Sequence, residues 1–163
     1  GFGAPRVPVA SAVFRVPLVH GYGRNAVVLD FLEQAKRDGE ARYVGTGENH
    51  WSAVHVDDLA HLYLLALEAL ASGALPPGTL IHPAATPTFS MRELAEAVAE
   101  GTGVGRTRSI SIEEARGASP FPFADLYASD MRLDATFARE TLGWRPSRLS
   151  LPEDIARGSY VQR

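Results

Sequence analysis

The sequence contains no cysteine, so it can form neither a disulfide framework nor a thiolate metal site. No apolar run reaches the ~18–20 residues that a membrane-spanning helix needs, and the first residues lack the charged and apolar parts of a secretory signal. There is also no basic excess, because 16 Lys and Arg face 19 Asp and Glu for a net charge of −3. We therefore expect a cytoplasmic protein that binds neither nucleic acid nor membranes.

The composition is that of a soluble globular protein, with 45% hydrophobic and 21% charged residues. At 163 residues the chain is one domain or part of one, and it is long enough to bury a core. We treat residues 1–163 as a single region, and expect the Gly- and Pro-rich residues 1–8 to form a loop.

Strand and helix patterns alternate along the chain. Residues 9–19 form a near-continuous apolar run, typical of a strand buried on both faces of a parallel sheet, although Arg15 and Pro17 interrupt it. Residues 79–83 form a second, shorter strand pattern. The alternation with helical segments predicts an α/β architecture.

The region from residue 45 to residue 68 predicts a turn, a strand and a helix in succession. Gly45 and Gly47 suit a tight turn, and residues 51–56 are aromatic and β-branched, as in a strand. Asp57 stands where a helix N-cap belongs. The helix that follows has one apolar face, formed by Leu59, Leu62, Tyr63, Ala66 and Leu70.

Capping signals locate three further helices. Asn25 is placed to cap a helix that Gly39 terminates. Ser90 and Glu93 form a capping-box pattern, with Gly101 expected to end that helix. A second such box, at Ser150 and Glu153, begins the last helix.

Three motifs in order resemble a known family. Residues 45–60 read G-x-G-x-x-x-x-x-x-V-H-V-x-D-L-A, residues 14–21 read FRVPLVHG, and residues 142–146 read LGWRP. Together they resemble the NAD-dependent epimerase/dehydratase family, the extended short-chain dehydrogenases/reductases. The resemblance covers residues 10–160. It implies the C-terminal part of a Rossmann-type NAD(P)-binding fold: the last parallel strands plus a small α/β substrate lobe, without the N-terminal dinucleotide-binding half.

The resemblance also implies a function for the longer parent protein. Such a protein would be an NAD(P)-dependent oxidoreductase or epimerase that transfers hydride at a carbinol or carbonyl carbon. Its partners would be NAD or NADP, a small-molecule substrate and the N-terminal Rossmann half, and assembly as a homo-oligomer is compatible with this. The alternative is a stand-alone, non-catalytic binding or interaction module derived from the same lobe.

Two elements of the family chemistry are missing from this chain. Neither G-x-G-x-x-G nor G-x-x-G-x-x-G, the Gly-rich turns that admit a pyrophosphate, occurs. The family's Tyr-x-x-x-Lys pair is also absent, because Lys36 is the only lysine and Leu32 stands four residues before it. We therefore expect no catalytic residue here, and expect the chain alone to be inactive.

The resemblance nevertheless assigns cofactor contacts to one segment. In the family, the loop after the Arg-x-Pro strand passes beside the nicotinamide. By position, Pro17, Leu18, Val19 and His20 would do so here. The alternative is that these residues are simply a strand end and a turn.

The resemblance places Asn49, Trp51 and His55 beside the substrate. Sugar-nucleotide members of the family usually carry an arginine at the position of Trp51, where a guanidinium can bind a diphosphate. An indole offers one N–H, a stacking face and no charge, which favours a less charged substrate. Trp51 as a core aromatic residue is an equally weighted alternative.

Four polar residues at the strand-to-helix corner could be interpreted as metal ligands: His55, Asp57, Asp58 and His61. We favour helix capping and dipole interactions for the two aspartates and a buried, hydrogen-bonded ring for His55, and expect no metal. A metal-dependent hydrolase built on this corner is the weaker alternative.

Overall fold

A computed structural model describes residues 9–118 and 123–161 of the chain. The expected N-terminal loop lies outside these residues. The strands are β1 (Ala12–Phe14), β2 (Leu18–His20), β3 (Ala41–Val44), β4 (His50–His55), β5 (Thr79–Ile81), β6 (Ala85–Ser90) and β7 (Thr107–Ile110). The helices are α1 (Ala26–Asp38), α2 (Val56–Ala71), α3 (Met91–Thr102), α4 (Ile112–Ala118), α5 (Phe123–Tyr127), α6 (Thr136–Glu140) and α7 (Leu151–Arg157).

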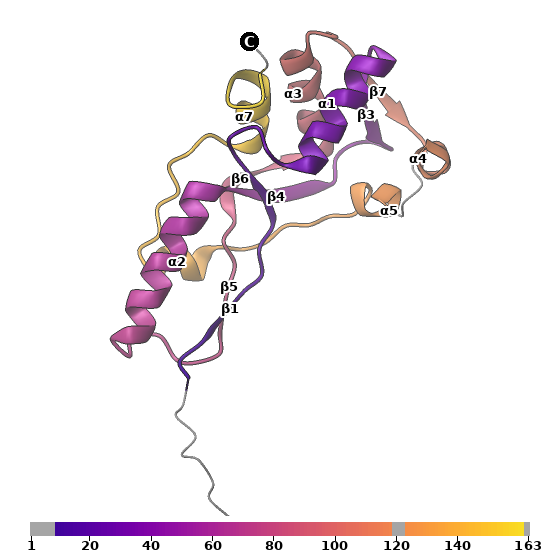
Figure 1. Cartoon of the computed structure of the whole chain (residues 1–163). Helices are drawn as coiled ribbons and strands as arrows, with labels where there is room; N and C mark the ends of the chain where they lie inside the picture. Colours follow the sequence, from indigo (N-terminus) through magenta and orange to yellow (C-terminus); the bar gives the residue numbers. More distant parts are fainter. Residues whose placement is uncertain (1–8, 119–122, 162–163) are drawn as a thin grey trace, which may run out of the picture.

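The strands form three small sheets within the described residues. β1 pairs with β5, β2 with β4, and β3 with β7, each in parallel, while β6 joins β4 antiparallel. Figure 1 shows α2 beside the β1–β5 pair at one end of the molecule and α1, α3 and the β3–β7 pair at the other. The predicted α/β architecture with parallel strands is therefore confirmed.

The prediction of a single strand at residues 9–19 is wrong, because this apolar run forms two strands. β1 ends at Phe14 and β2 begins at Leu18, and the two strands pair with different partners. Pro17 lies in the break because it has no N–H to donate to a ladder. The run is also not buried on both faces, since Val13 of β1 is 54% exposed.

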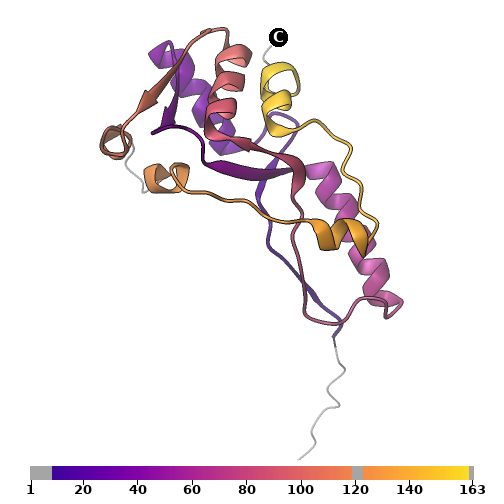
Figure 2. The same cartoon turned by 180° about the vertical axis from the view of Figure 1, so that it is seen from behind.

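Two apolar clusters form most of the core. The larger joins α1, α3 and α7 to β3 and β4, and includes Val28, Leu32, Trp51, Leu94, Val98 and Ile155. The second joins α2, β4 and β5 to α6 and the segment after it, and includes Val54, Leu62, Ile81, Ala138 and Trp144. Seen from behind (Figure 2), α7 lies beside α3, and the segment between α5 and α6 runs from the β3–β7 end of the molecule to the side of α2.

Local capping signals predicted most helix ends. The Asn25 side chain accepts from the Val28 N–H and Gly39 ends α1 in the left-handed region, as expected. The capping box of Ser90 and Glu93 is also confirmed, but α3 continues past the predicted end and stops at Gly103, whose φ of 74° suits glycine.

The start of α2 and the strand β6 differ from the prediction. The N-cap of α2 is His55 rather than Asp57, because the His55 ring accepts the Asp57 N–H. β6 was not predicted, since Pro87 within it weakens the strand signal. No helix in the described ranges is both long and apolar enough to cross a bilayer.

Candidate functional site

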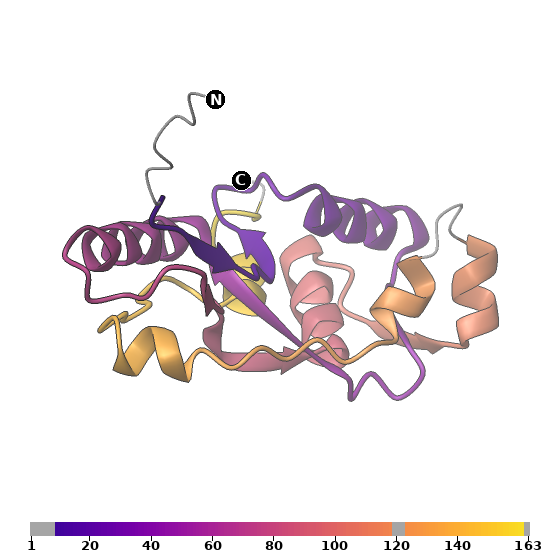
Figure 3. The same cartoon turned by 90° about the horizontal axis from the view of Figure 1, so that it is seen from below.

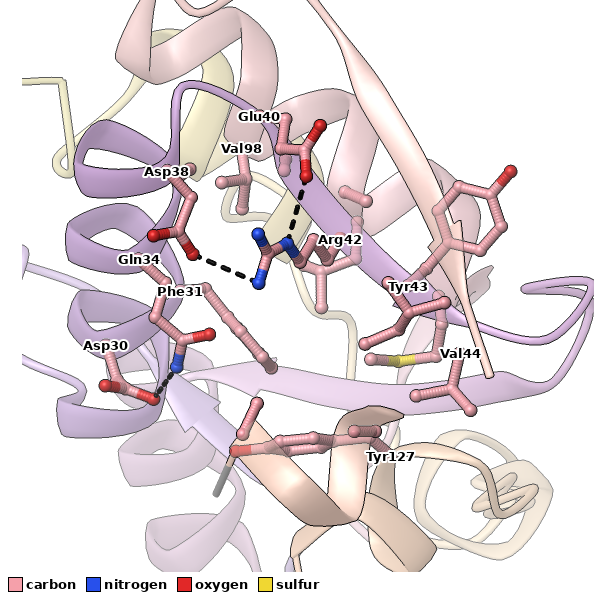
Figure 4. A pocket seen from close by; sticks show the side chains of 18 of the residues that line it. Asp30, Phe31, Gln34, Asp38, Glu40, Arg42, Tyr43, Val44, Val98 and Tyr127 are labelled. Atoms are coloured by element: carbon pink, nitrogen blue, oxygen red, sulfur yellow. Dashed lines mark hydrogen bonds and ion pairs between the residues drawn. The ribbon is translucent and has the colours of Figure 1, made fainter. Parts of the chain in front are cut away.

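A cavity of about 260 Å³ opens between α1, β3, α3 and the α4–α5 segment (Figure 4). Its walls are mostly apolar: Phe31 comes from α1, Leu94 and Val98 from α3, and Tyr127 from the end of α5. The rings of Phe31 and Tyr127 lie 5.0 Å apart, centroid to centroid, in a tilted arrangement. Burial raises the pKa of Tyr127, so its phenol stays protonated at neutral pH. The cavity can therefore bind an apolar group of small-molecule size.

The rim of the cavity is charged, and its arginines are paired with carboxylates. Arg42 Nη1 lies 3.2 Å from Asp38 Oδ2, and Arg42 Nε donates to Glu40 Oε1 at 3.1 Å. Figure 4 shows both contacts. Arg37 also bonds Asp38, and Arg108 bonds Glu40 at 2.7 Å. The hydrogen bond from Arg37 holds the pKa of Asp38 below its usual range, and the bond from Arg108 does the same for Glu40. Both carboxyls are therefore ionised at neutral pH.

Asn49 and Trp51 form hydrogen bonds with the segment that carries Tyr127, one of the cavity walls. The Asn49 amide donates to the backbone carbonyls of Tyr127 and Ser129, each at 2.8 Å, and the Trp51 indole N–H donates to the Ser129 carbonyl at 3.0 Å. Trp51 is 2% exposed and its ring lies 5.9 Å from that of Tyr127. Trp51 is thus a core residue that positions a cavity wall. Direct contact of Asn49 or Trp51 with a substrate stays a prediction.

The segment that Asn49 and Trp51 hold runs along β4. The backbone of Ser52 donates to the Met131 carbonyl at 3.0 Å, and Met131 donates to the His50 carbonyl at 2.8 Å. Viewed from below (Figure 3), this segment is the extended stretch between α5 and α6. The start of β4 therefore fixes where α5 and its Tyr127 lie.

His20 and His55 lie together at the other end of the same sheet, away from Asn49 and Trp51. They are register partners at the carboxyl ends of β2 and β4, and their rings meet edge to face at 5.3 Å. His20 is 3% exposed and donates from Nδ1 to Asp154 Oδ2 at 3.0 Å. Leu18 and Val19 precede it in β2 and are half-buried.

Asp154 of α7, which sequence reasoning missed, anchors this histidine pair. Its carboxylate also accepts the Ser159 N–H at 2.6 Å and the Ser159 hydroxyl at 3.1 Å. Burial alone would raise the pKa of Asp154, but these hydrogen bonds and that from His20 hold it below 3.8. His20 and Asp154 lie 134 positions apart in the sequence, so no local pattern could reveal the pair.

This buried carboxylate predicts acid lability. The pKa of Asp154 is lower in the folded state than its unfolded value near 3.8. The ionised carboxylate therefore stabilises the fold above the unfolded pKa, and this stabilisation is lost as pH falls through the folded-state pKa. We expect Asp154→Asn to lower the free energy of unfolding by about 2 kcal/mol at pH 7, by weakening buried charged hydrogen bonds. Denaturant melts at pH 7 and pH 3 test this. An equal loss at both pH values would contradict it.

The two aspartates of the strand-to-helix corner form structural contacts. Asp58 is buried, and its two carboxylate oxygens accept the backbone N–H groups of Ser147 and Arg148, each at 3.0 Å. Asp57 instead accepts the Tyr22 hydroxyl and lies 3.1 Å from Arg148 Nη2. His61 is exposed on α2. Among the residues that the structure describes, no group of three or more metal-ligating side chains comes together.

Comparison with known proteins identifies related sequences. Residues 9–78 match the model of the NAD dependent epimerase/dehydratase family. An uncharacterized protein of Schizosaccharomyces pombe is 32% identical over 154 residues, which cover 93% of this chain and 50% of that protein. A 2-alkyl-3-oxoalkanoate reductase of Stenotrophomonas maltophilia is 32% identical over 108 residues, covering 66% of this chain and 32% of the reductase.

A solved structure extends the similarity to the fold. UDP-glucose 4-epimerase of Thermotoga maritima, solved with UDP-glucose, superposes with a TM-score of 0.61 at 27% identity, covering 91% of this chain and 45% of the epimerase. The chain spans about half the length of two curated relatives that it matches, and its mixed α/β fold corresponds to part of the Rossmann-like fold of the epimerase. The chain is thus similar over residues 9–78 to the NAD-dependent epimerase/dehydratase family, and over most of its length to part of the fold of a solved epimerase.

Proposed function

We propose that the chain is the substrate-binding C-terminal region of an NAD(P)-dependent oxidoreductase or epimerase. In the full-length protein, hydride would pass between the nicotinamide and a carbinol or carbonyl carbon of a small molecule. The observation that carries this proposal is the cavity, whose wall at Tyr127 is held in place by Asn49 and Trp51. The body of a substrate would occupy that cavity, positioned by Asn49 and Trp51 through Tyr127. Its reacting carbon would extend along β4 toward His55, beside which the nicotinamide would lie.

The cofactor would lie at the carboxyl end of β2. Ligands of open α/β sheets bind outside the carboxyl ends of the parallel strands, and β2 and β4 end together at His20 and His55. Pro17, Leu18 and Val19 would then line the nicotinamide side. His20 is buried against Asp154, so it would keep the strand end in place. NAD or NADP supplies the hydride chemistry when bound.

The N-terminal Rossmann half would be the partner of β1. Among the described strands β1 pairs with β5 alone, which leaves the other edge of β1 and the exposed Val13 for a further strand. That half would carry the Gly-rich turn and the Tyr-x-x-x-Lys pair, so this chain alone would not catalyse hydride transfer. We propose a cytoplasmic location for the whole enzyme, which can also assemble as a homo-oligomer.

A non-catalytic alternative uses the same cavity, whose described lining residues come from this chain. A stand-alone binding module derived from the lobe would have this property. The two proposals differ in whether NAD(P)H is consumed.

The test is a hydride-transfer assay on the native polypeptide that contains this chain. We expect nicotinamide absorbance to fall when a carbonyl substrate is added, and expect the 163-residue chain alone to be inactive. Tyr127→Ala in the active polypeptide should raise KM more than it lowers kcat, because Tyr127 would contact only the substrate body. A native polypeptide that binds the small molecule but consumes no NAD(P)H would support the binding module instead.

A further inference from the structure

We infer that the cavity between α1, β3 and α3 takes the apolar body of a neutral, phosphate-free carbonyl or carbinol compound, and that its acidic rim disfavours nucleotide sugars. The inference rests on the proposed function, because it assigns the substrate class of that same cavity. It departs from the UDP-glucose that the Thermotoga maritima epimerase holds. Three observations support it.

The first observation is the apolar lining. Tyr43 and Val44 of β3 are half-buried and leave apolar surface open to the cavity. Behind this surface the lining includes four residues of α3 that are at most 4% exposed: Met91, Leu94, Ala95 and Val98. The facing rings of Phe31 and Tyr127 complete this surface. A surface of this kind gains free energy by covering hydrocarbon, and it offers a sugar few hydrogen-bond partners.

The second observation is that the arginines of the rim are already bonded to carboxylates. Arg37 bonds Asp38, and Arg42 bonds both Asp38 and Glu40. A diphosphate would have to displace these carboxylates to gain a bidentate contact. Arg108, which approaches from β7, is likewise shared between Glu40 and Glu114.

The third observation is the sign of the charge that faces an incoming ligand. With the Arg108–Glu114 pair included, the cavity and its rim carry four carboxylates, of Asp30, Asp38, Glu40 and Glu114, against the three guanidiniums of Arg37, Arg42 and Arg108. Asp30 accepts the Gln34 amide at 2.6 Å, a neutral donor that leaves its charge in place. Such a rim repels an anion, and its oxygens can accept a hydroxyl hydrogen of a neutral ligand.

The test is direct binding to the 163-residue chain with no nicotinamide present. The probes are a neutral aromatic ketone, 4-phenyl-2-butanone, and UDP, each followed by ligand-observed NMR. We expect the ketone to bind and UDP not to bind at the same concentration. Tyr127→Ala should weaken ketone binding by about tenfold, since it removes one apolar wall. The matched control, Tyr63→Ala on α2, changes a ring outside the cavity and should leave ketone binding unchanged.

A second variant tests the rim without touching the core. In the double variant Asp38→Asn with Glu40→Gln, Arg42 loses both carboxylate partners. We expect this variant to bind inorganic pyrophosphate and UDP about tenfold more tightly than the parent chain, the result of two freed guanidinium contacts. The variant retains the apolar lining, so ketone binding should persist.

The outcomes separate this inference from the proposed function. UDP binding to the parent chain more tightly than the ketone overturns the inference, as does ketone binding that Tyr127→Ala leaves unchanged. Absence of ketone binding also overturns it. If the ketone binds but the native polypeptide never consumes NAD(P)H, the proposed function fails and the inferred ligand class stands.

Discussion

Replacing Trp144 by alanine should bring the chain close to unfolding. The Trp144 side chain is fully buried in the cluster with Val54, Leu62 and Ile81, and its indole N–H donates to the Asp58 carbonyl at 2.9 Å. Truncation of a buried tryptophan costs about 3–5 kcal/mol, a large part of the ~5–15 kcal/mol by which domains are stable. Equilibrium denaturation followed by circular dichroism measures this loss.

Two further variants distinguish packing from hydrogen bonding. Trp144→Phe removes the hydrogen bond but keeps an aromatic ring, so we expect a smaller loss of about 1–3 kcal/mol. Leu149→Ala, at a side chain that is 45% exposed, should change stability by no more than about 0.5 kcal/mol. If Trp144→Ala were as stable as the parent chain, the LGWRP segment would not be part of the core.

The 163-residue chain on its own should self-associate. Val13 of β1 is 54% exposed and Leu80 of β5 is 42% exposed, and β1 pairs on one side only among the described strands. An open strand edge with apolar side chains invites further pairing. We expect Val13→Lys to weaken self-association by roughly tenfold, equivalent to about 1.4 kcal/mol. Sedimentation over a concentration series gives the measurement.

The control for Val13→Lys is a lysine at an exposed apolar position outside the described strands. Leu149→Lys adds the same charge to an exposed apolar position that lies in no strand, so it should leave self-association unchanged. A parent chain that stays monomeric over the whole concentration series would refute the open edge. The same edge is where we propose that the N-terminal Rossmann half pairs.

Local sequence signals predicted local structure well. The cap at Asn25, the glycine that ends α1 and the capping box at Ser90 depend on residues within a few positions of one another, and each is confirmed. The motif at residues 45–60 also gave the order of turn, strand and helix correctly, since one short segment holds all the necessary information. Its cap was assigned two residues late because a histidine ring took the place of a carboxylate.

Contacts between distant segments could not be predicted in this way. The apolar run at residues 9–19 looked continuous, yet its halves pair with strands at residues 50–55 and 79–81. The bond between His20 and Asp154 and the cavity wall at Tyr127 likewise depend on segments far apart in sequence. Family resemblance pointed to Asn49 and Trp51, but only the tertiary structure shows that both side chains donate hydrogen bonds to the segment that carries Tyr127.

The intact mass of the native polypeptide tests the central claim most directly. That claim is that this chain is the substrate-side region of a larger NAD(P)-dependent enzyme. We expect a mass far above 17.5 kDa, with additional sequence preceding Gly1 that contains a Gly-rich strand–turn–helix and a Tyr-x-x-x-Lys pair. A native mass that matches these 163 residues would contradict the claim and leave a binding module as the function.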